Sequence, residues 1–400
     1  MQRTTGTYRT TTVGGEKVRA FIPHALPPQR PPLQITGDLP RLLAEATVAI
    51  GRLEVAGTMV PSTGWFLYGF VRKEALVSSQ IEGTQATLED VLVREANPQA
   101  SRPDDVEEVC NYVDALAFAR REMARPKGLP LCTRLLCATH KRLMKGVRGS
   151  EKSPGQIRNT QNWIGGTRPG NAHFVPPPPD AVLEALAALD QWLHREDPLP
   201  PLVRIGLAHV QFETIHPFLD GNGRIGRLLL TLLFEHWHLL SLPILYLSLA
   251  FKQHRDEYYR RLDQVRSEGD WESWTAFFLE CVRDSAADGV RAARRLHALL
   301  GTDRQTVLYH KSTTVPAVRL FDLLPEHPMV TLAKAQELLA TTKPTATKAI
   351  QALCAAGVLH EITGKQRDRI YAYQGYLQVL AEDTDLPSRP PGRLGAGEGN

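Results

Sequence analysis

The sequence has 400 residues, enough for two or more domains, and its 42% hydrophobic and 22% charged residues are ordinary for a globular protein. Its 47 Lys and Arg against 43 Asp and Glu leave a net charge of only +4, so bulk charge gives no reason to expect binding to nucleic acid or to an anionic membrane. The five scattered cysteines lack CxxC spacing, which predicts reduced thiols. No signal-peptide pattern is present, and the most apolar stretch, 228–249, is interrupted by polar residues and proline. We therefore expect a cytoplasmic protein without a membrane span.

The first 300 residues contain one extended segment, a long helical region and one interruption. Residues 1–37 are rich in Thr, Pro and Gly, which predicts an extended arm lying on the body of the protein. From Leu39 to about Gly301, apolar residues recur at steps of three and four, as in packed helices. Residues 164–179 break this pattern. Pro169-Gly170 suits the centre of a type II turn, so we expect a β-hairpin here.

The C-terminal part has a different pattern. Three short helices are expected at 315–324, 331–340 and 345–356, followed by strands at 358–362 and 369–373, which is the order of a winged helix-turn-helix. Its recognition helix and wing would carry basic residues that could contact a DNA backbone, namely Lys343, Lys348, Lys365, Arg367 and Arg369. Protein docking or dimerisation is the alternative use of such a module. From residue 382 the chain is polar and rich in Gly and Pro, which predicts disorder.

The segment from His216 to Arg227, HPFLDGNGRIGR, carries the strongest chemical signal. Gly221, Asn222 and Gly223 can adopt backbone conformations that point successive N–H groups at one place. A helix starting near Gly223 would present its positive end to the same place. This loop is therefore suited to binding phosphates.

Side chains next to the loop have matching chemistry. Arg224 and Arg227 occupy neighbouring positions of the expected helix and can hold further phosphate oxygens. Asp220 offers a carboxylate oxygen to Mg²⁺, and His216 titrates near neutrality, as a general base should. The ordinary alternative, a glycine-rich turn with two surface arginines, does not explain why all these residue types occur in one ordered arrangement.

This segment resembles the Fic/Doc family signature HPFx[DE]GNGRxxR at every specified position. Residues 154–158 (PGQIR) and 163–166 (WIGG) resemble the family's strand leading into its flap hairpin, and 172–177 (AHFVPP) resemble the returning arm. The resemblance covers about residues 20–300. It implies a mainly α fold, with a Fic helical bundle that carries a β-hairpin flap and is followed by the winged helix.

The resemblance also implies residue roles. In relatives the histidine, here His216, deprotonates a target hydroxyl that attacks the α-phosphorus of ATP, and pyrophosphate leaves. Asp220 would hold Mg²⁺. Gly221, Asn222 and Gly223 would bind the phosphates, Arg224 the α- and β-phosphates, and Arg227 the γ-phosphate. The adjoining Ile225 and Gly226 are also implied in nucleotide binding. Tyr258 or Tyr259 would contact the adenosine. Those implied in docking the target on the flap are His173, Phe174 and Val175.

A second motif, SSQIEG at Ser78–Gly83, resembles the family's inhibitory pattern [ST]xxxE[GN]. Ser78 and Glu82 lie on one face of a helix because they are four residues apart. The resemblance implies that Glu82 pairs with Arg227 and so blocks the seat of the γ-phosphate. The alternative is a solvated carboxylate before Gly83, a glycine that simply ends a helix.

Other histidines suggest a weaker alternative. His209, Glu213 and His216 have helical spacing that could indicate zinc, but no fourth ligand is visible at suitable spacing. The expected divisions are an extended arm (1–37), a helical region with the inhibitory helix (38–130), the Fic core (131–301), the winged helix (311–377) and a disordered tail (382–400).

The expected function is an autoinhibited protein adenylyltransferase that transfers AMP from ATP to a Ser, Thr or Tyr hydroxyl, including one of its own. Its expected cofactor is Mg²⁺. Expected partners are ATP and a target protein, with a homodimer and DNA, bound through 311–377, left open. Three alternatives remain: a deAMPylase or bifunctional enzyme with the same site, transfer of another phosphate group, and a nucleotide-sensing transcription regulator.

Overall fold

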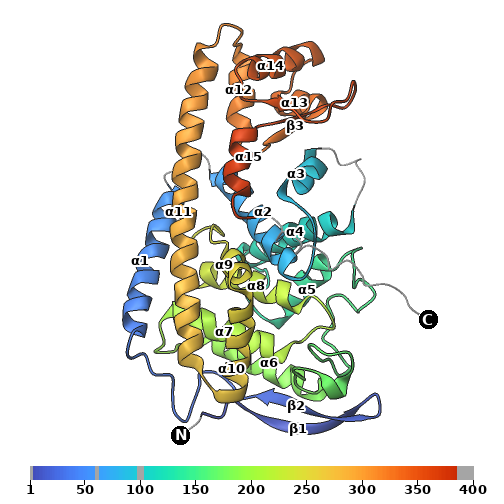
Figure 1. Cartoon of the computed structure of the whole chain (residues 1–400), viewed down its shortest axis with the longest axis vertical. Coiled ribbons are helices and arrows are strands. Elements are labelled where there is room, and N and C mark those ends of the chain that lie inside the picture. Colours follow the sequence, from blue (N-terminus) through green and yellow to red (C-terminus); the bar gives the residue numbers. More distant parts are fainter. Residues whose placement is uncertain (1–2, 59–62, 97–102, 385–400) are drawn as a thin grey trace, which may run out of the picture.

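The computed structural model describes residues 3–58, 63–96 and 103–384, and it is mainly helical, as predicted (Figure 1). The helices that build the body follow the periodicity of the apolar residues. They are α1 (Leu39–Thr58), α2 (Thr63–Ile81), α3 (Leu88–Ala96), α4 (Asp104–Ala124), α5 (Thr133–Leu143), α6 (Pro179–His194), α7 (Pro201–Ile215), α8 (Asn222–His236), α9 (Leu247–Gln253), α10 (Arg255–Glu268) and α11 (Trp271–Tyr309).

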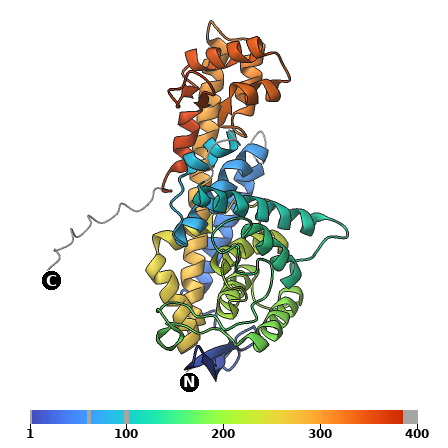
Figure 2. The same ribbon diagram turned by 90° about the vertical axis from the view of Figure 1, so that its right-hand side faces the viewer.

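Helix α11, of 39 residues, runs the length of the molecule and packs along α1 (Figures 1 and 2). Asp270 caps its start, accepting a hydrogen bond from Ser273 N–H. The predicted end of the body at residue 301 is wrong, because the helix continues through Gly301 to Tyr309. A glycine inside a helix costs only about 1 kcal/mol, and burial of Val307 beyond it favours continuation.

The N-terminal arm is extended, as predicted, but its strands pair with each other. Strands β1 (Gly6–Val13) and β2 (Glu16–Pro23) form an antiparallel hairpin, and the turn between them uses Gly14 and Gly15, both with positive φ. The hairpin lies against residues 172–175: Phe21 N–H donates to the Val175 carbonyl at 2.9 Å. It therefore covers one side of the predicted flap.

The flap is less regular than the predicted hairpin. Its arms pair through a single β-bridge between Ile164 and Phe174, and Pro169–Asn171 form one 3-10 turn, η1. The predicted type II turn is wrong, because positive φ occurs at Gly165 and Gly166 and not at Gly170. The Asn171 side chain closes the loop instead, accepting hydrogen bonds from the N–H groups of residues 167 and 168.

The C-terminal module contains the predicted helices and strands, with one additional strand. Its elements are α12 (Val315–Leu323), β3 (Met329–Thr331), α13 (Leu332–Leu339), α14 (Lys343–Ala355), β4 (His360–Glu361) and β5 (Ile370–Ala372), and the antiparallel sheet has the order β3-β5-β4. Helices α12, α13 and α14 pack on one another. The assignment of this module to the winged-helix class stays a prediction.

A helix missing from the sequence prediction, α15 (Gln374–Ala381), returns the chain to the body. It packs on α11 and α2 so closely that a Cβ on Gly69 would lie 2.5 Å from Leu380 Cδ2. The next residues were predicted to be disordered, but Glu382 accepts a hydrogen bond from buried Lys73 through its carbonyl, and Thr384 is buried. The rest of the predicted tail, 385–400, lies outside the described residues.

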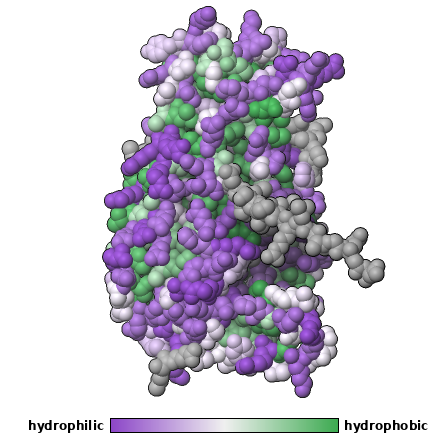
Figure 3. All heavy atoms as spheres, viewed as in Figure 1, coloured by the Kyte–Doolittle hydropathy of each residue, from purple (hydrophilic) through white to green (hydrophobic). Residues whose placement is uncertain are grey.

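The face of the molecule seen in Figure 1 is mostly polar. Figure 3 shows mainly hydrophilic side chains over the face seen in Figure 1, interrupted by small hydrophobic areas. Within the described ranges, no helix has both the length and the apolar character needed to cross a bilayer.

Two helical glycines allow the packing of the body to be tested. Gly206 of α7 faces α11: an added Cβ would lie 2.9 Å from Phe278 Cδ1 and 3.3 Å from Trp274 Nε1. We expect Gly206→Ala to lower the free energy of unfolding by about 1–3 kcal/mol through overpacking. Gly51 of α1 is the matched control, since its added Cβ would meet nothing within 4 Å. Gly51→Ala should raise that free energy by up to about 1 kcal/mol, from helix propensity. Equal shifts in denaturant unfolding would contradict the close packing of α7 on α11.

Candidate active site

The loop between α7 and α8 is held by its own side chains. His216 ends α7 in the left-handed conformation (φ 49°), and Gly221, also left-handed, precedes α8. Asn222 braces the turn, because its amide accepts from Phe218 N–H and donates to the Phe218 carbonyl, both at 2.8 Å. Asn222 is 2% exposed, so its side chain organises the loop and only its backbone is available to a ligand.

The start of α8 is suited to binding an anion. The first N–H groups of a helix have no carbonyl partner one turn earlier, so they are available to an anion. In α8 the first hydrogen bond of the helix runs from Ile225 N–H to the Gly221 carbonyl. Gly223 has no Cβ, which leaves room for an anion beside the helix start. Glu82 Oε1 lies in that room, because an added Cβ on Gly223 would collide with it. A carboxylate therefore already occupies the place predicted for phosphate.

That carboxylate belongs to the predicted inhibitory motif, which the structure brings to Arg227. The Arg227 guanidinium donates to Ser78 Oγ and to the Ser78 carbonyl at 2.9 Å, and to Glu82 Oε1 at 2.7 Å. Gly83, with φ of 98°, follows Glu82 beyond the end of α2. The side chain of Arg227 is 2% exposed and that of Glu82 is 34% exposed. Burial opposes ionisation of Glu82, but the charge and hydrogen bond of Arg227 outweigh it and lower its pKa.

The second arginine of the motif also has a carboxylate partner. Arg224 Nη1 donates to Glu108 Oε2 of α4 at 3.0 Å, and Arg224 Nη2 lies 3.8 Å from Asp220 Oδ1. Both Arg224 and Glu108 are almost fully buried. Sequence analysis missed Glu108, since no local motif surrounds it.

Asp220 lies at the mouth of the loop and can serve a metal. Its Oδ1 accepts from Gly221 N–H at 2.7 Å, and its Oδ2 pairs with Lys152 Nζ at 2.8 Å, a partner that sequence analysis also missed. Burial works against ionisation of Asp220, but Lys152 and the hydrogen bonds lower its pKa. Within the described residues no group of three or more His, Cys, Asp or Glu could hold a metal ion. A half-exposed carboxylate next to a phosphate site still fits Mg²⁺, which commonly uses one or two carboxylates with substrate phosphates and water.

The expected titration of His216 near neutrality is wrong, because its imidazole is desolvated. Burial, aided by the positive charges of Arg158 and Arg266, lowers its pKa to about 3, so the imidazole is unprotonated at neutral pH. Its Nδ1 is buried, with no hydrogen-bond partner among the described residues. Arg158 Nε donates to the His216 carbonyl at 2.8 Å and so fixes the backbone beneath the ring.

Three of the predicted nucleotide-binding residues are engaged in packing. Ile225 is fully buried, and Gly226 allows α8 to approach α7, with its carbonyl hydrogen-bonded to His209 Nδ1. Tyr258 is 1% exposed and its hydroxyl contacts His209 Nε2 at 2.8 Å, so it is a packing residue. These contacts also explain His209 without zinc. Tyr259 is 40% exposed and stays a predicted adenosine contact.

The flap side chains are only partly available to a partner. Phe174 and Val175 are buried, with Phe174 packed against Phe21 of β2, so their side chains do not face solvent, and their part in docking a target stays a prediction. The side chain of His173 is 67% exposed and lies 3.6 Å from Asp263. Of the three predicted docking side chains, His173 alone faces solvent.

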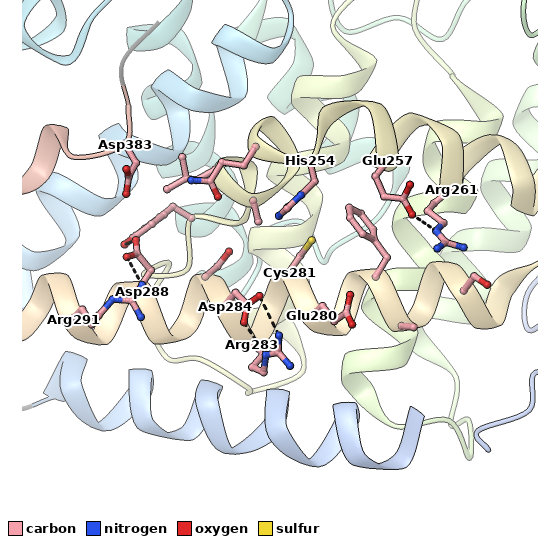
Figure 4. Close-up of a pocket in the computed structure, with 18 residues that line it drawn as sticks. His254, Glu257, Arg261, Glu280, Cys281, Arg283, Asp284, Asp288, Arg291 and Asp383 are labelled. Carbon is pink, nitrogen blue, oxygen red and sulfur yellow. Dashed lines mark hydrogen bonds and ion pairs between the residues drawn. The ribbon is translucent and has the colours of Figure 1, made fainter. Parts of the chain in front are cut away.

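A separate cavity of about 660 Å³ lies between α9, α10 and α11 (Figure 4). His254, Glu257, Cys281 and Asp288 are among its lining residues, and none of the predicted site residues lines it. Its charges largely pair with one another, as between Asp288 and Arg291. We assign no function to this cavity.

Comparison with known proteins agrees with the geometry. Residues 40–121 match the Fic/DOC family N-terminal domain and residues 130–234 match the Fic/DOC family. A protein adenylyltransferase Fic of Culex quinquefasciatus is 32% identical over 148 residues, which are 36% of this chain and 26% of that protein. One of Drosophila grimshawi is 28% identical over 206 residues, 50% of this chain and 39% of that protein. The chain thus spans less than half the length of these relatives.

Among solved structures, a Fic family protein from Desulfovibrio desulfuricans G20 is similar over 86% of this chain and 98% of its own. The TM-score is 0.54 and the sequence identity 24%. At this identity the likeness supports the fold alone.

The state of the histidine can be tested directly. Because burial lowers the pKa of His216 to about 3, its imidazole resonances should not titrate between pH 8 and pH 5. Histidine-selective NMR, with His216→Ala to assign the signal, would measure this. A midpoint near the unperturbed value of about 6.5 would contradict a desolvated, neutral base.

Proposed function

Because this chain belongs to the Fic/DOC family, we propose that it is a protein adenylyltransferase, held inactive by Glu82, that transfers AMP from ATP to a protein hydroxyl. One observation carries the proposal: the Glu82 carboxylate is bound to Arg227 and lies beside Gly223 at the start of α8, where a phosphate would otherwise be bound. Relatives named protein adenylyltransferases support the reaction type.

The phosphates of ATP would bind where the helix start and the two arginines converge. Backbone N–H groups of residues 222–224 supply uncharged donors, and Arg224 and Arg227 supply charge-assisted ones. Asp220 would hold Mg²⁺, which when bound neutralises charge on the phosphates. Lys152 already neutralises Asp220, so it must give up this ion pair when the metal binds.

His216 would act on the acceptor. Its neutral imidazole takes the proton of a Ser, Thr or Tyr hydroxyl while the hydroxyl oxygen forms a bond to the α-phosphorus of ATP. The bond from the α-phosphorus to its bridging oxygen breaks, and pyrophosphate leaves. The acceptor is a hydroxyl of another protein or of this chain itself.

Glu82 inhibits by competition. While its carboxylate is bound to Arg227, that arginine cannot hold the γ-phosphate. A hydrogen bond between charged groups is worth about 1.5–3 kcal/mol, which corresponds to roughly ten- to a hundredfold in productive binding. Since Glu82 is partly exposed, its side chain can leave without crossing the core.

Two alternatives use the same observations. The exposed carboxylate of Glu82 could position a water that hydrolyses an AMP–protein bond, which would make the chain a deAMPylase or a bifunctional enzyme. A nucleotide-sensing regulator would instead use the C-terminal module, whose exposed Lys343 and Lys348 suit DNA, while a second copy of the chain is another candidate partner. Such a sensor has no need of His216.

Labelled ATP separates these functions. With α-labelled ATP and Mg²⁺, we expect label on protein, whereas γ-labelled ATP should leave none. His216→Ala should lower the rate of α-label transfer by about 10²–10⁴-fold, because the hydroxyl keeps its proton during attack. Retained γ-label would mean phosphoryl transfer, and a wild-type rate in the variant would remove His216 from the mechanism.

Release of the inhibitory carboxylate gives a second test. Glu82→Gly should raise self-modification from α-labelled ATP by about ten- to a hundredfold, since Arg227 is freed for the γ-phosphate. The gain should disappear in Glu82→Gly/Arg227→Ala. If Glu82 positions a hydrolytic water, Glu82→Gly should also lose AMP removal from a modified protein. No change in either activity would leave Ser78–Gly83 as an ordinary helix end.

A further inference from the structure

Glu108 is a buried carboxylate beneath the predicted phosphate site that no motif or comparison assigns to a role. Its side chain is 1% exposed, and its Oε2 accepts from Arg224 Nη1 at 3.0 Å and from Thr84 Oγ1 at 3.1 Å. Its Oε1 lies 3.5 Å from Arg148 Nε and has no hydrogen-bond partner among the described residues. The Glu108 carboxylate is thus bound to the Nη1 end of the Arg224 guanidinium.

The two arginines of the motif are engaged differently. Arg227 uses both Nε and Nη2 on Ser78 and Glu82, so that edge of its guanidinium is occupied. Arg224 is bound to Glu108 through Nη1, while its Nε has no hydrogen-bond partner in the described part of the chain. Among the same residues its Nη2 has only long contacts, with Met144 Sδ at 3.5 Å and with Asp220 Oδ1 at 3.8 Å. The Nε–Nη2 edge of Arg224 is therefore not bound closely to any anionic side chain of the described residues, and such an edge suits bidentate binding of phosphate.

The carboxylates of Glu82 and Glu108 differ in burial, and they therefore differ in whether they can leave their arginine. Glu82 is 34% exposed and can leave Arg227 for solvent, whereas Glu108 and Arg224 are 1% and 3% exposed at their side chains. Removing one partner of a buried ion pair leaves an uncompensated charge, so Glu108 is not expected to leave as Glu82 can. Glu108 therefore does not compete with the nucleotide.

We propose that Glu108 is a positioning residue for nucleotide binding: it fixes the Arg224 guanidinium with its Nε–Nη2 edge directed to the α- and β-phosphates. The proposal rests on the proposed function, because Arg224 is the predicted contact for these phosphates. It concerns binding, and it can therefore be tested without any transfer reaction.

The test compares nucleotides that differ by the γ-phosphate, by calorimetry with Mg·ADP and Mg·ATP, in the full chain carrying Glu82→Gly so that the site is open. Adding Glu108→Gln should weaken both nucleotides by the same factor, about tenfold or more, since the carboxylate charge that strengthens the hydrogen bond from Arg224 is lost. Adding Arg227→Ala should weaken Mg·ATP alone. A merely structural defect would lower the melting temperature without producing this pattern.

Thr84→Val is the matched control. It removes the other hydrogen bond to Glu108 Oε2, at a residue that is equally buried, but leaves the bond to Arg224 in place. Its Mg·ADP affinity should stay within about twofold of the parent. An equal loss in Thr84→Val would mean that any disturbance of this cluster weakens binding, and would overturn the proposal.

A double-mutant cycle with Arg224→Met decides whether Glu108 acts through Arg224. In Glu108→Gln/Arg224→Met the Mg·ADP affinity should equal that of Arg224→Met alone. Three outcomes would each overturn the proposal: additive losses in the double variant, unchanged affinity in Glu108→Gln, or tighter binding in Glu108→Gln. Tighter binding would make Glu108 a second competitor of the nucleotide. Absence of α-label transfer together with the expected affinities would instead contradict the proposed function alone.

Discussion

The buried guanidinium of Arg227 constrains the rest of the site. A cation that is 2% exposed must have an anion beside it, and the start of α8 favours an anion at the same place. The protein meets this need with Ser78 and Glu82 at the end of α2. The pairing of Arg227 with Glu82 is thus electrostatically complete, and any ligand that replaced Glu82 would have to supply equivalent negative charge. In the proposed function, inhibition and nucleotide binding both depend on this need of Arg227 for an anion.

Around this pair the loop is rigid before any ligand arrives. Asn222 braces the turn, Arg158 holds the His216 carbonyl, and Glu108 holds Arg224. Groups fixed in this way need little reorganisation when a substrate binds, which favours catalysis by placement. Glu82 is the exception, because its side chain remains partly in solvent. The mobile element of the site is therefore a single side chain on a fixed frame.

The loop and the contact of Ser78 and Glu82 with Arg227 could be predicted, because each motif is compact and made of chemically distinctive residues. Glu108, Lys152 and Arg158 could not be, since each is an isolated charge whose partner lies 58 to 116 residues away. Tyr258 and Tyr259 are adjacent in sequence, and only the packing of α10 decides which one is buried. The N-terminal hairpin was missed because its threonine-rich strand lacks apolar alternation, although Gly14-Gly15 was a signal for a tight turn.

Helix α15 and the residues after it have a consequence for how the molecule can be divided. Leu380 fills the space beside Gly69, and Glu382 binds Lys73, on the same helix α2 that carries Ser78 and is followed by Glu82. Cutting the chain before α12 would therefore uncover a packed face of α2. The boundary that the sequence pattern suggests is not a boundary in the packing, so removing the C-terminal module would also disturb the helix that holds Ser78 against Arg227.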